Sequence, residues 1–334
     1  MTIAAQRHKI IQKIAALPDA DFEETALEVF RFQYFFNPVY RTFVDLLGVD
    51  YQSVNSISRL PFLPISAFKN HVVRTGDWTP ETVFTSSGTT GSATSRHWVR
   101  NLDFYTRNTV RGFEVFYGSP ADYCVLALLP SYLEREGSGL ISMVAHFIAL
   151  SKYRESGFFL RNHDELVARI TKCQKKRIPV LLIGVSFALL DLAEAYELNL
   201  EGVIVMETGG MKGRRREMTR EELHGFLKER FHVPEIHSEY GMTEMFSQAY
   251  ARKSGRFFPA PTLRVLSREM TDPLTLQKTG KTGALNLIDL ANFDTASFIA
   301  TDDLGRVYEN HSFEVLGRMD ASDARGCNLL LLEK

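Results

Sequence analysis

The chain has 334 residues, of which 45% are hydrophobic and 24% are charged, as is usual for a globular protein that buries a sizeable core. These values exclude wholesale disorder, collagen-like repeats and a small disulfide-stapled scaffold. With 39 Lys and Arg against 40 Asp and Glu, the formal net charge is -1. This balance argues against a nucleic-acid partner bound through phosphate neutralisation.

The sequence shows neither a disulfide framework nor a targeting segment. Its three cysteines, Cys124, Cys173 and Cys327, are too few and too unevenly spaced for a disulfide scaffold or a structural zinc site. Charges are scattered through the N-terminal segment, which does not resemble a signal peptide. No apolar stretch reaches the roughly 18 residues that a membrane-spanning helix needs. We therefore expect a cytoplasmic protein without a transmembrane segment.

Aromatic residues are concentrated near the N-terminus. Eight of them lie between Phe22 and Phe43, interspersed with charged side chains. Pro38 falls inside this segment, and proline interrupts a helix. We therefore predict one or two helices whose rings pack into a core.

From about residue 120, short apolar runs alternate with amphipathic segments. Buried strands are predicted at Tyr123–Leu129, Val180–Ile183 and Val203–Met206, and a further strand is predicted at Val233–His237. Helices are predicted after Ser138, over Phe187–Tyr196 and after the capping-box pair Thr219 and Glu222. Strands that alternate with helices predict an α/β fold in which a largely parallel sheet is covered on both faces.

The pattern changes after Gly255, where short strands with turn residues follow one another. We interpret this part as a smaller β-rich subdomain of the same unit. The expected organisation is an α/β core over residues 1–255, the β-rich subdomain over residues 256–316 and a C-terminal segment over residues 317–334.

An unusual segment, TSSGTTGSATS, covers Thr85–Ser95 and contains eight Ser or Thr residues among its eleven. Apolar residues flank it on both sides, so it interrupts a compact sequence, whereas a Ser/Gly linker would join two domains. Glycines let backbone N–H groups approach an oxyanion closely, and hydroxyl groups donate further hydrogen bonds. The segment therefore predicts a phosphate-binding loop, although it lacks the Gly-Lys-Ser/Thr ending of a Walker loop.

Three further segments carry polar groups suited to a nucleotide. SEYGMTEM, over Ser238–Met245, combines an aromatic ring for a base, a hydroxyl for a phosphate and a carboxylate for Mg²⁺. ATDDLGRV, over Ala300–Val307, carries a carboxylate that suits ribose hydroxyls. GRMDASDARG covers Gly317–Gly326.

Taken in this order, the segments resemble motifs of the adenylate-forming (acyl-/aryl-CoA synthetase-like) superfamily. Tyr240–Glu244 is similar to its YGxTE motif, and Thr301–Leu304 is similar to its TGDL motif with Asp302 in place of glycine. Gly317–Gly326 is similar to its hinge motif, one residue shorter. Thr208 and the two glycines after it fall where the superfamily has a Gly-rich loop that contacts adenine. The resemblance spans about residues 60–326 and implies the N-terminal domain fold of these enzymes.

This resemblance implies ATP and Mg²⁺ as cofactors and gives roles to individual residues. Thr243 is expected to contact the α-phosphate and Glu244 to hold Mg²⁺, and both are expected to be catalytic. The residues expected to bind ATP are Thr85, Ser86, Ser87, Gly88, Thr89, Thr90, Gly91, Gly209, Gly210, Tyr240, Asp303 and Arg318. Walls of an acyl pocket are expected at Tyr132, Ser186, Phe187 and Met211.

The C-terminal end departs from the superfamily pattern. Typical members continue past the hinge into a mobile lid domain that carries a catalytic lysine, whereas this chain stops eight residues after Gly326. We therefore expect the lid domain to be lacking. Cys327 lies in this segment instead, two residues after Arg325, whose positive charge favours the thiolate.

Size, phosphate loop and near-terminal cysteine together resemble the acyl-protein synthetase (LuxE-type) family, a component of bacterial fatty acid reductases. The resemblance implies a ligase that converts a fatty or other carboxylic acid into acyl-AMP. The acyl group would then pass to Cys327 as a thioester, for delivery to an acyl-CoA reductase-like partner or an acyl carrier.

Two other interpretations stay open. The first is a serine hydrolase or acyltransferase that uses Ser186, because GVSFA lies between a predicted strand and a predicted helix, as a nucleophile elbow does. Asp289 and His311 follow Ser186 in the order that such enzymes permit. The second is a catalytically retired adenylate-forming subunit that only binds a partner.

Overall fold

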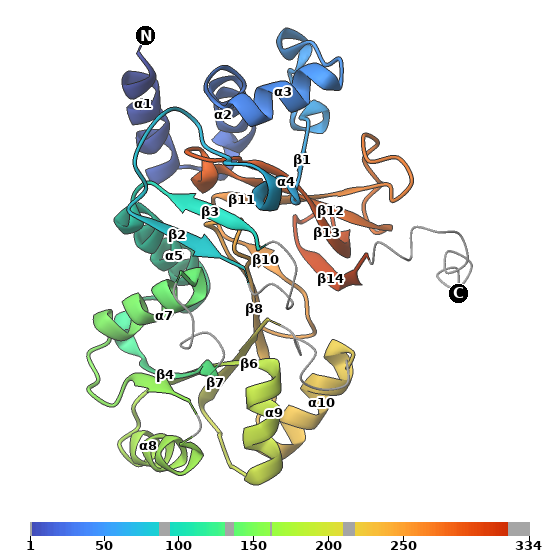
Figure 1. The fold of residues 1–334 in the computed structure, drawn as a ribbon. Coiled ribbons are helices and arrows are strands. Elements are labelled where there is room, and N and C mark those ends of the chain that lie inside the picture. Colours follow the sequence, from blue (N-terminus) through green and yellow to red (C-terminus); the bar gives the residue numbers. More distant parts are fainter. Residues whose placement is uncertain (1, 87–93, 131–136, 161, 210–217, 320–334) are drawn as a thin grey trace. The chain divides into compact units, whose positions relative to one another are not determined.

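A computed structural model describes residues 2–86, 94–130, 137–160, 162–209 and 218–319 (Figure 1). The chain divides into two compact units. One consists of the described residues of Met1–Gly76 and Leu263–Lys334, and we call it the discontinuous unit. The other consists of the described residues of Asp77–Thr262, and we call it the central unit.

The central unit is built on a seven-stranded sheet with the order β10-β9-β8-β7-β6-β4-β5. Neighbouring strands from β5 to β8 are parallel, and β9 and β10 add antiparallel pairs at one edge. The strands are β4 (Cys124–Leu128), β5 (Gly157–Phe159), β6 (Val180–Val185), β7 (Val203–Thr208), β8 (His237–Tyr240), β9 (Ala249–Ala251) and β10 (Phe258–Pro259). All residues of β4 and β6 are buried, as parallel strands covered on both faces require.

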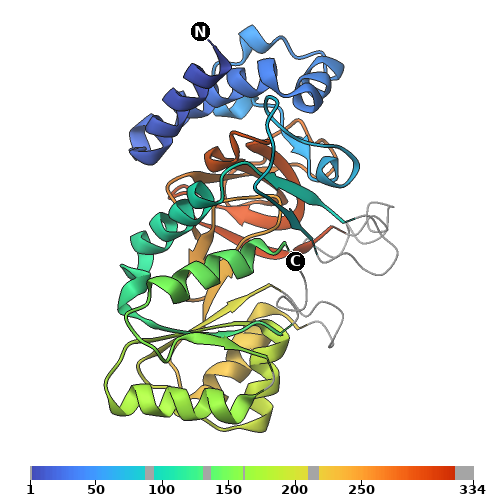
Figure 2. The same ribbon diagram turned by 60° about the vertical axis from the view of Figure 1, so that its left-hand side comes forward.

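Helices cover both faces of this sheet (Figures 1 and 2). On one face lie α5 (Leu102–Tyr117) and α7 (Gly139–Leu150); on the other lie α8 (His163–Lys175), α9 (Ser186–Ala195) and α10 (Arg220–Phe231). The connection from β4 to β5 runs along the sheet in the opposite direction from the connections that follow it. Right-handed crossovers therefore place α7 opposite α8, α9 and α10. The predicted α/β fold with a covered, largely parallel sheet is confirmed.

Two of these helices begin where the sequence predicts. The Ser138 hydroxyl accepts a hydrogen bond from the backbone N–H of Ile141 at the start of α7. Thr219 and Glu222 form a complete capping box at the start of α10. Side chains thus satisfy backbone N–H groups that have no partner inside the helix.

The strand predicted over Val233–His237 is wrong in position, because β8 begins only at His237. His232 ends α10 in the left-handed conformation, with φ of 50°. Pro234 has no backbone N–H to give to a sheet. The chain between α10 and β8 is therefore a connection, and Ser238 lies within the strand rather than after it.

The discontinuous unit combines N-terminal helices with a sheet formed mainly by the C-terminal part of the chain. The sheet has the order β1-β13-β12-β11, and β14 also pairs with β13. Its strands are β1 (Leu63–Pro64), β11 (Leu263–Arg268), β12 (Thr282–Asp289), β13 (Phe298–Val307) and β14 (Phe313–Arg318). The helices are α1 (Ile3–Ala15), α2 (Phe22–Phe36), α3 (Pro38–Leu46) and the short α4 (Ala67–Asn70). Only β1 runs parallel to its neighbour.

The predicted aromatic helices are α2 and α3, and the break between them lies at Asn37 and Pro38. The Asn37 side chain accepts a hydrogen bond from the backbone N–H of Tyr40, which starts α3. The rings of Phe30 and Tyr40 lie 6.2 and 5.8 Å from the ring of Phe298 on β13. Five of the eight aromatic side chains are buried and Phe35 is 51% exposed, so the prediction as core is confirmed for most of the segment.

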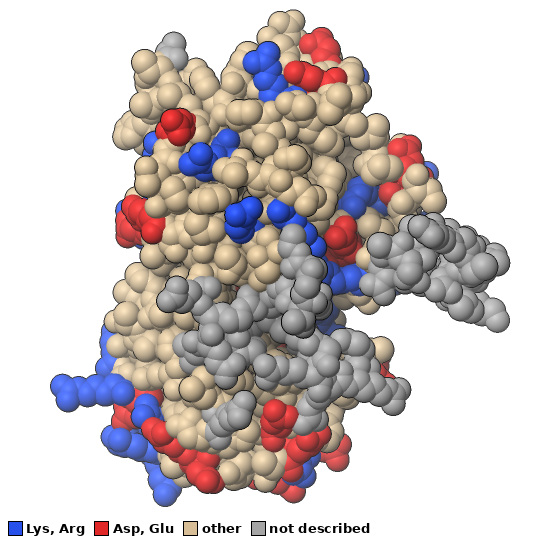
Figure 3. Space-filling model, in the orientation of Figure 1, with Lys and Arg blue, Asp and Glu red and all other residues tan. Residues whose placement is uncertain are grey.

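Charged side chains of both signs are interspersed on the surface shown in Figure 3. Some of them form exposed ion pairs, such as Lys152 with Asp122 in the central unit. Exposed pairs of this kind contribute little to stability. Among the described residues, no helix is long and apolar enough to span a membrane.

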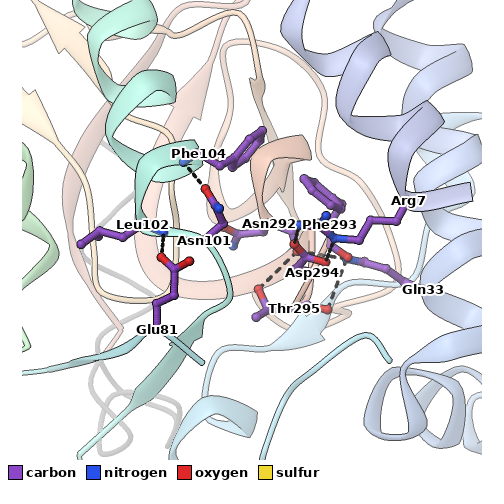
Figure 4. Close-up of polar contacts among 10 residues, drawn as sticks. All are labelled: Arg7, Gln33, Glu81, Asn101, Leu102, Phe104, Asn292, Phe293, Asp294 and Thr295. Atoms are coloured by element: carbon purple, nitrogen blue, oxygen red, sulfur yellow. Dashed lines mark hydrogen bonds and ion pairs between the residues drawn. The ribbon is translucent and has the colours of Figure 1, made fainter. Parts of the chain in front are cut away.

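A buried amide joins α2 to the turn between β12 and β13 (Figure 4). Gln33 is fully buried, and its Oε1 accepts a hydrogen bond from the backbone N–H of Ser297. Its Nε2 lies within 3.1–3.2 Å of three carbonyl oxygens, those of Asn292, Phe293 and Thr295. A leucine here would remove the acceptor of the buried Ser297 N–H and the donor that the three carbonyl oxygens share.

We predict that Gln33→Leu lowers the free energy of unfolding by about 2–4 kcal/mol, because buried backbone groups lose their hydrogen bonds. The control is Gln52→Leu at an exposed position, for which we expect a change within about 0.5 kcal/mol. Chemical denaturation followed by circular dichroism measures both. Equal changes in the two variants would contradict the prediction.

Candidate functional site

The Ser/Thr segment predicted to bind phosphate starts and ends on one hairpin of the central unit. β2 (Thr82–Thr85) pairs antiparallel with β3 (Arg96–Val99). Beyond the last pair, the Ser86 N–H donates to the carbonyl oxygen of Ser95 at 3.1 Å. The Ser95 N–H donates in turn to Ser86 Oγ at 2.9 Å. The two ends of the segment are therefore held together.

A close backbone approach fixes the end of β2. The Thr85 N–H donates to the carbonyl oxygen of Gly137 at 2.7 Å. Gly137 has φ of 75°, and a Cβ at this position would come within 2.5 Å of the Val83 carbonyl oxygen. Glycine alone adopts this conformation without strain or collision. It therefore allows the segment that leads into α7 to run against the hairpin.

The YGMTE segment, Tyr240–Glu244, starts on the last residue of β8 and continues into the turn after it. The Tyr240 ring is buried, and its centroid lies 5.8 Å from that of Phe257. A Cβ at Gly241 would lie 2.5 Å from Oε1 of Glu239, so a larger residue here would clash with the Glu239 carboxyl group. The segment lies at the carboxyl end of a parallel strand, where open α/β sheets bind their ligands.

A buried histidine joins the hairpin to this turn. His97 lies on β3, and its Nδ1 is 2.8 Å from the carbonyl oxygen of Thr243. Its ring also stacks on Phe246 at a centroid distance of 4.6 Å. Burial lowers the pKa of His97 to about 4, although the hydrogen bond with Thr243 opposes this shift. The ring is therefore neutral at pH 7, and Nδ1 carries the hydrogen that it donates to the carbonyl.

This contact brings together the two parts of the sequence that are predicted to bind phosphate and Mg²⁺. His97 lies two residues after the end of the Ser/Thr segment, and Thr243 lies 146 residues further along the chain. Glu244, the predicted Mg²⁺ ligand, is the next residue, and it is 6% exposed. The structure thus connects the base of the Ser/Thr segment with the predicted catalytic pair.

A second group of polar side chains surrounds the carboxyl ends of β7 and β8. Thr208 Oγ1 lies 2.5 Å from Glu239 Oε2, and the two residues are direct neighbours in the sheet. Ser186 Oγ lies 3.2 Å from Glu207 Oε2 and 3.0 Å from the carbonyl oxygen of Gly209. Because successive residues of a strand face opposite sides, Thr208 and Glu207 approach different helix layers. These contacts hold the end of β7 and Gly209, which begins the predicted adenine-contacting loop.

The two buried carboxyl groups of this cluster differ in their affinity for protons. Burial raises the pKa of Glu239 to about 7; the hydrogen bond with Thr208 opposes this shift and the charge of Glu207 adds to it. Burial also acts to raise the pKa of Glu207, but hydrogen bonding with His224 and the charge of Arg220 lower it overall. Arg220 Nε and His224 Nε2 lie 3.4 and 3.5 Å from Glu207 Oε1. At pH 7, Glu207 is therefore charged and Glu239 is partly protonated.

Ser186 has the position of a nucleophile elbow but not its contacts. It is the first residue of α9, directly after β6, and it is 2% exposed. Its hydroxyl bonds to a carboxylate and to a carbonyl oxygen, whereas a nucleophilic serine is activated by an adjacent base such as an imidazole. The geometry favours a structural role at the end of β7 over the serine-hydrolase alternative.

The discontinuous unit holds another pair of predicted nucleotide-binding residues. Asp303 on β13 and Arg318 on β14 are cross-strand partners, and Arg318 Nε lies 3.3 Å from Asp303 Oδ1. Asp303 is 7% exposed, whereas the side chain of Arg318 is 70% exposed. The carboxyl group is thus held in place, and the guanidinium group is accessible. Asp302, which replaces the glycine of the superfamily motif, is exposed.

The other predicted site residues fall into two groups. Phe187 is buried in α9. The rest lie outside the described residues: Ser87, Gly88, Thr89, Thr90, Gly91, Tyr132, Gly210, Met211 and Cys327. The roles expected for both groups stay predictions.

The two other cysteines are buried. Cys124 lies on β4 and Cys173 on α8. Burial raises the pKa of Cys124 to about 12 and raises that of Cys173 above its ordinary value. Both thiols stay protonated at neutral pH and are therefore poor nucleophiles.

Sequence reasoning missed His97 and Glu207 as members of the site. In the strand Arg96–Val99 the first residue is exposed, while the second and fourth are buried. The period-two alternation of a strand could have placed His97 on the buried side. Glu207 follows four apolar residues of β7 and is its last residue but one, and a carboxylate at such a position signals a buried charge that needs partners.

The residues that the structure describes offer few ligands for a metal ion. Within the described part of the chain, no three His, Cys, Asp or Glu side chains form a group that could hold a metal ion. Mg²⁺ at nucleotide sites is usually held by one or two carboxylates together with substrate phosphates. A single buried carboxylate such as that of Glu244 therefore fits Mg²⁺ bound to a nucleotide.

No protein-family model matches the sequence, and no curated protein sequence matches it. Solved structures do match. A 2-hydroxyisobutyryl-CoA ligase in an open conformation, in complex with 2-HIB-AMP and CoA, has a TM-score of 0.67 at 11% identity, over 91% of this chain and 71% of that chain. ATP-bound MatB from Rhodopseudomonas palustris has a TM-score of 0.53 at 18% identity, over 71% of this chain and 47% of that chain. The ATP-bound RpMatB-BxBclM chimera B1 has a TM-score of 0.54, with the same identity and coverage.

At these identities the likeness establishes the fold. The chain has the α/β fold of these adenylate-forming ligases, as the sequence predicts. It spans about half the length of the MatB structures that it matches.

We predict that Glu239→Gln changes how stability depends on pH. A carboxyl group whose pKa is higher in the folded state stabilises the fold fully below its unfolded pKa, and this contribution is lost as pH rises through the folded pKa, here about 7. A glutamine side chain does not titrate, so its contribution to stability does not change with pH. The unfolding free energy of the variant relative to the native protein should therefore rise between pH 5 and pH 8, by on the order of 2 kcal/mol.

Urea denaturation of both proteins at several pH values measures this difference. Glu229→Gln, at an exposed position on α10, serves as the matched control and should show no such rise. A difference for Glu239→Gln that stays constant from pH 5 to pH 8 would count against a raised pKa.

Proposed function

We propose that this chain is a ligase that uses ATP and Mg²⁺ to convert a carboxylic acid into its acyl-adenylate and then loads the acyl group on Cys327. One observation carries the proposal: the hydrogen bond from His97 to Thr243, which links the base of the Ser/Thr segment with the YGMTE turn. The fold shared with acid–CoA ligases supports it.

In the first step, a carboxylate oxygen of the acid attacks the α-phosphorus of ATP in line. The bond between the α-phosphorus and the oxygen that bridges to the β-phosphate breaks, and pyrophosphate leaves. Such a transfer needs positioning and charge neutralisation more than covalent help from the protein. Backbone N–H groups and hydroxyls in the first part of the Ser/Thr segment, Thr85–Gly91, would hold the β- and γ-phosphates. Thr243 would contact the α-phosphate, and Glu244 would hold the Mg²⁺ that neutralises the phosphate charge.

Other residues would orient the nucleoside. We propose Gly209, Gly210 and Tyr240 for the adenine, since the Tyr240 ring is already packed and needs no ordering when a base arrives. Asp303 and Arg318 are proposed for the ribose, because a carboxylate accepts strong hydrogen bonds from hydroxyl groups and a guanidinium donates them.

In the second step, the Cys327 thiolate attacks the acyl carbonyl carbon, the bond between this carbon and the phosphate oxygen breaks, and AMP leaves. The product is a thioester on the protein itself. We propose a fatty acid as the substrate, for which each buried methylene group would contribute about 0.8 kcal/mol to binding. An acyl-CoA reductase-like partner or an acyl carrier would then receive the acyl group.

The retired-subunit alternative predicts a protein without turnover. A retired site has no need of a buried Glu244, or of an Asp303 held by Arg318. These residues favour the enzymatic proposal.

We predict that Glu244→Gln lowers acid-dependent pyrophosphate release about 100-fold, because the transition state loses a charged Mg²⁺ ligand. A coupled pyrophosphate assay with a panel of short-, medium- and long-chain acids measures this. The control Glu229→Gln changes an exposed carboxylate and should release pyrophosphate at the native rate. Full activity of Glu244→Gln would count against the site, and a native protein without turnover on any acid would favour the retired subunit.

We predict that incubation with ATP and a substrate acid adds one acyl group to the protein and that neutral hydroxylamine removes it. Intact-protein mass spectrometry detects both changes. Cys327→Ser should still release pyrophosphate in a first turnover but gain no hydroxylamine-labile mass. Cys173→Ala is the control, because a buried thiol with a raised pKa should not be acylated. An adduct that persists in Cys327→Ser and disappears in Ser186→Ala would support the serine alternative.

A further inference from the structure

A buried arginine to which no role has been assigned lies in the sheet of the discontinuous unit. Arg268 is the last residue of β11, and it is 6% exposed. Burial lowers its pKa, while the negative charge of Asp302 acts to raise it. A buried guanidinium group is costly unless its donors are paired, so its partners show what holds it there.

Its partners lie on the next two strands of the sheet. Nη1 donates to the carbonyl oxygen of Leu285 at 2.8 Å and to Oδ1 of Asn286 at 2.7 Å, both on β12. Nη2 donates to the carbonyl oxygen of Thr301 on β13 at 2.6 Å. One side chain from β11 thus reaches across β12 and bonds to the backbone of β13.

The Thr301 carbonyl oxygen, which accepts the hydrogen bond from Arg268, lies where the pairing between β12 and β13 is interrupted. The register between β12 and β13 shifts, so that Leu285 alone lies opposite three residues, Thr301, Asp302 and Asp303. Such a bulge removes ladder hydrogen bonds and changes the direction of the side chains that it carries. Side-chain contacts replace the lost bonds: Thr301 Oγ1 donates to the Leu285 carbonyl at 2.8 Å and accepts from the Asp303 N–H at 3.2 Å.

We propose that Arg268 is a positioning residue whose guanidinium group fixes the Thr301–Asp303 bulge and thereby aims the Asp303 carboxylate at the ribose hydroxyls of ATP. The proposal rests on the proposed function, in which Asp303 binds ribose. Arg268 itself touches no nucleotide in this scheme. It holds the Thr301 carbonyl, and the Thr301 hydroxyl holds the backbone N–H of Asp303.

A second arginine on the same strand provides a matched control. Arg264 is also buried, but it pairs with Asp19 and lies over the Phe22 ring at 4.4 Å. Its Nη1 also donates to the carbonyl oxygen of Leu263 on β11 at 3.0 Å, so none of these three partners belongs to the bulge. Loss of either guanidinium group removes a buried cation from β11, whereas only loss of Arg268 removes the bond to Thr301.

The experiment compares the binding of ATP, 2′-deoxyATP and 3′-deoxyATP to the full chain by isothermal titration calorimetry. The ratio of the dissociation constants for deoxyATP and ATP reports how well the ribose hydroxyls are bound. We expect Asp303→Ala to abolish this preference for ATP and Arg268→Met to lower it about tenfold. Arg264→Met should keep the native ratio. Arg268→Lys keeps the charge but loses the planar pair of donors, and it should give an intermediate ratio even if the methionine variant does not fold.

The outcomes separate the two proposals. An unchanged ratio in both Arg268 variants, with a lowered ratio in Asp303→Ala, would overturn the positioning role and leave the ribose role of Asp303 intact. An unchanged ratio in Asp303→Ala, or a native protein that binds no ATP, would overturn the proposed function and the positioning role together. A reduced stability of Arg268→Met with a native ratio would make Arg268 a residue of the core alone.

Discussion

The hydrogen bond from the neutral ring of His97 to the carbonyl oxygen of Thr243 is the contact on which the account of the site depends. It lies in an apolar setting beside Phe246, where a hydrogen bond is stronger than in water and an unpaired carbonyl is costly. The low pKa of His97 keeps the ring neutral across the physiological range. Within this range the hydrogen bond that holds the hairpin of the Ser/Thr segment against the turn after β8 is therefore independent of pH.

Buried polar groups recur at the points where the regular structure is interrupted. Glu207 and Glu239 lie where two parallel strands end, and Arg268 supports a bulge. Each of these groups costs free energy to bury and is stabilised by specific partners. Such partners fix the backbone around them more strictly than apolar packing does, because a hydrogen bond requires both distance and direction. This rigidity suits segments that are proposed to orient a nucleotide.

The parts of the fold that depend on local sequence could be predicted. The apolar runs that became β4, β6 and β7, the cap at Ser138 and the capping box at Thr219 are all local signals. The strand predicted over Val233–His237 is wrong in position, because Pro234, the second residue of this range, has no backbone N–H to donate to a sheet.

The parts that depend on distant pairing could not be predicted. Leu63 pairs with Ile299, and Gln33 bonds to a turn more than 250 residues away. No local pattern records such partners. The same limit applies to the site: the motifs marked Thr243 and Asp303, but His97 and Arg268 became visible only through the groups that they contact. A buried histidine or arginine carries no motif of its own, because its role is set by geometry.

The central claim is that an acid oxygen attacks the α-phosphorus of ATP, and isotope transfer tests it most directly. The acid is prepared with heavy oxygen in its carboxylate and incubated with the protein, ATP and Mg²⁺, and the nucleotide and phosphate products are analysed by mass spectrometry. The account predicts AMP that carries one heavy oxygen atom, together with unlabelled pyrophosphate. Heavy oxygen in inorganic phosphate with ADP as the nucleotide product, or AMP without any label, would contradict it.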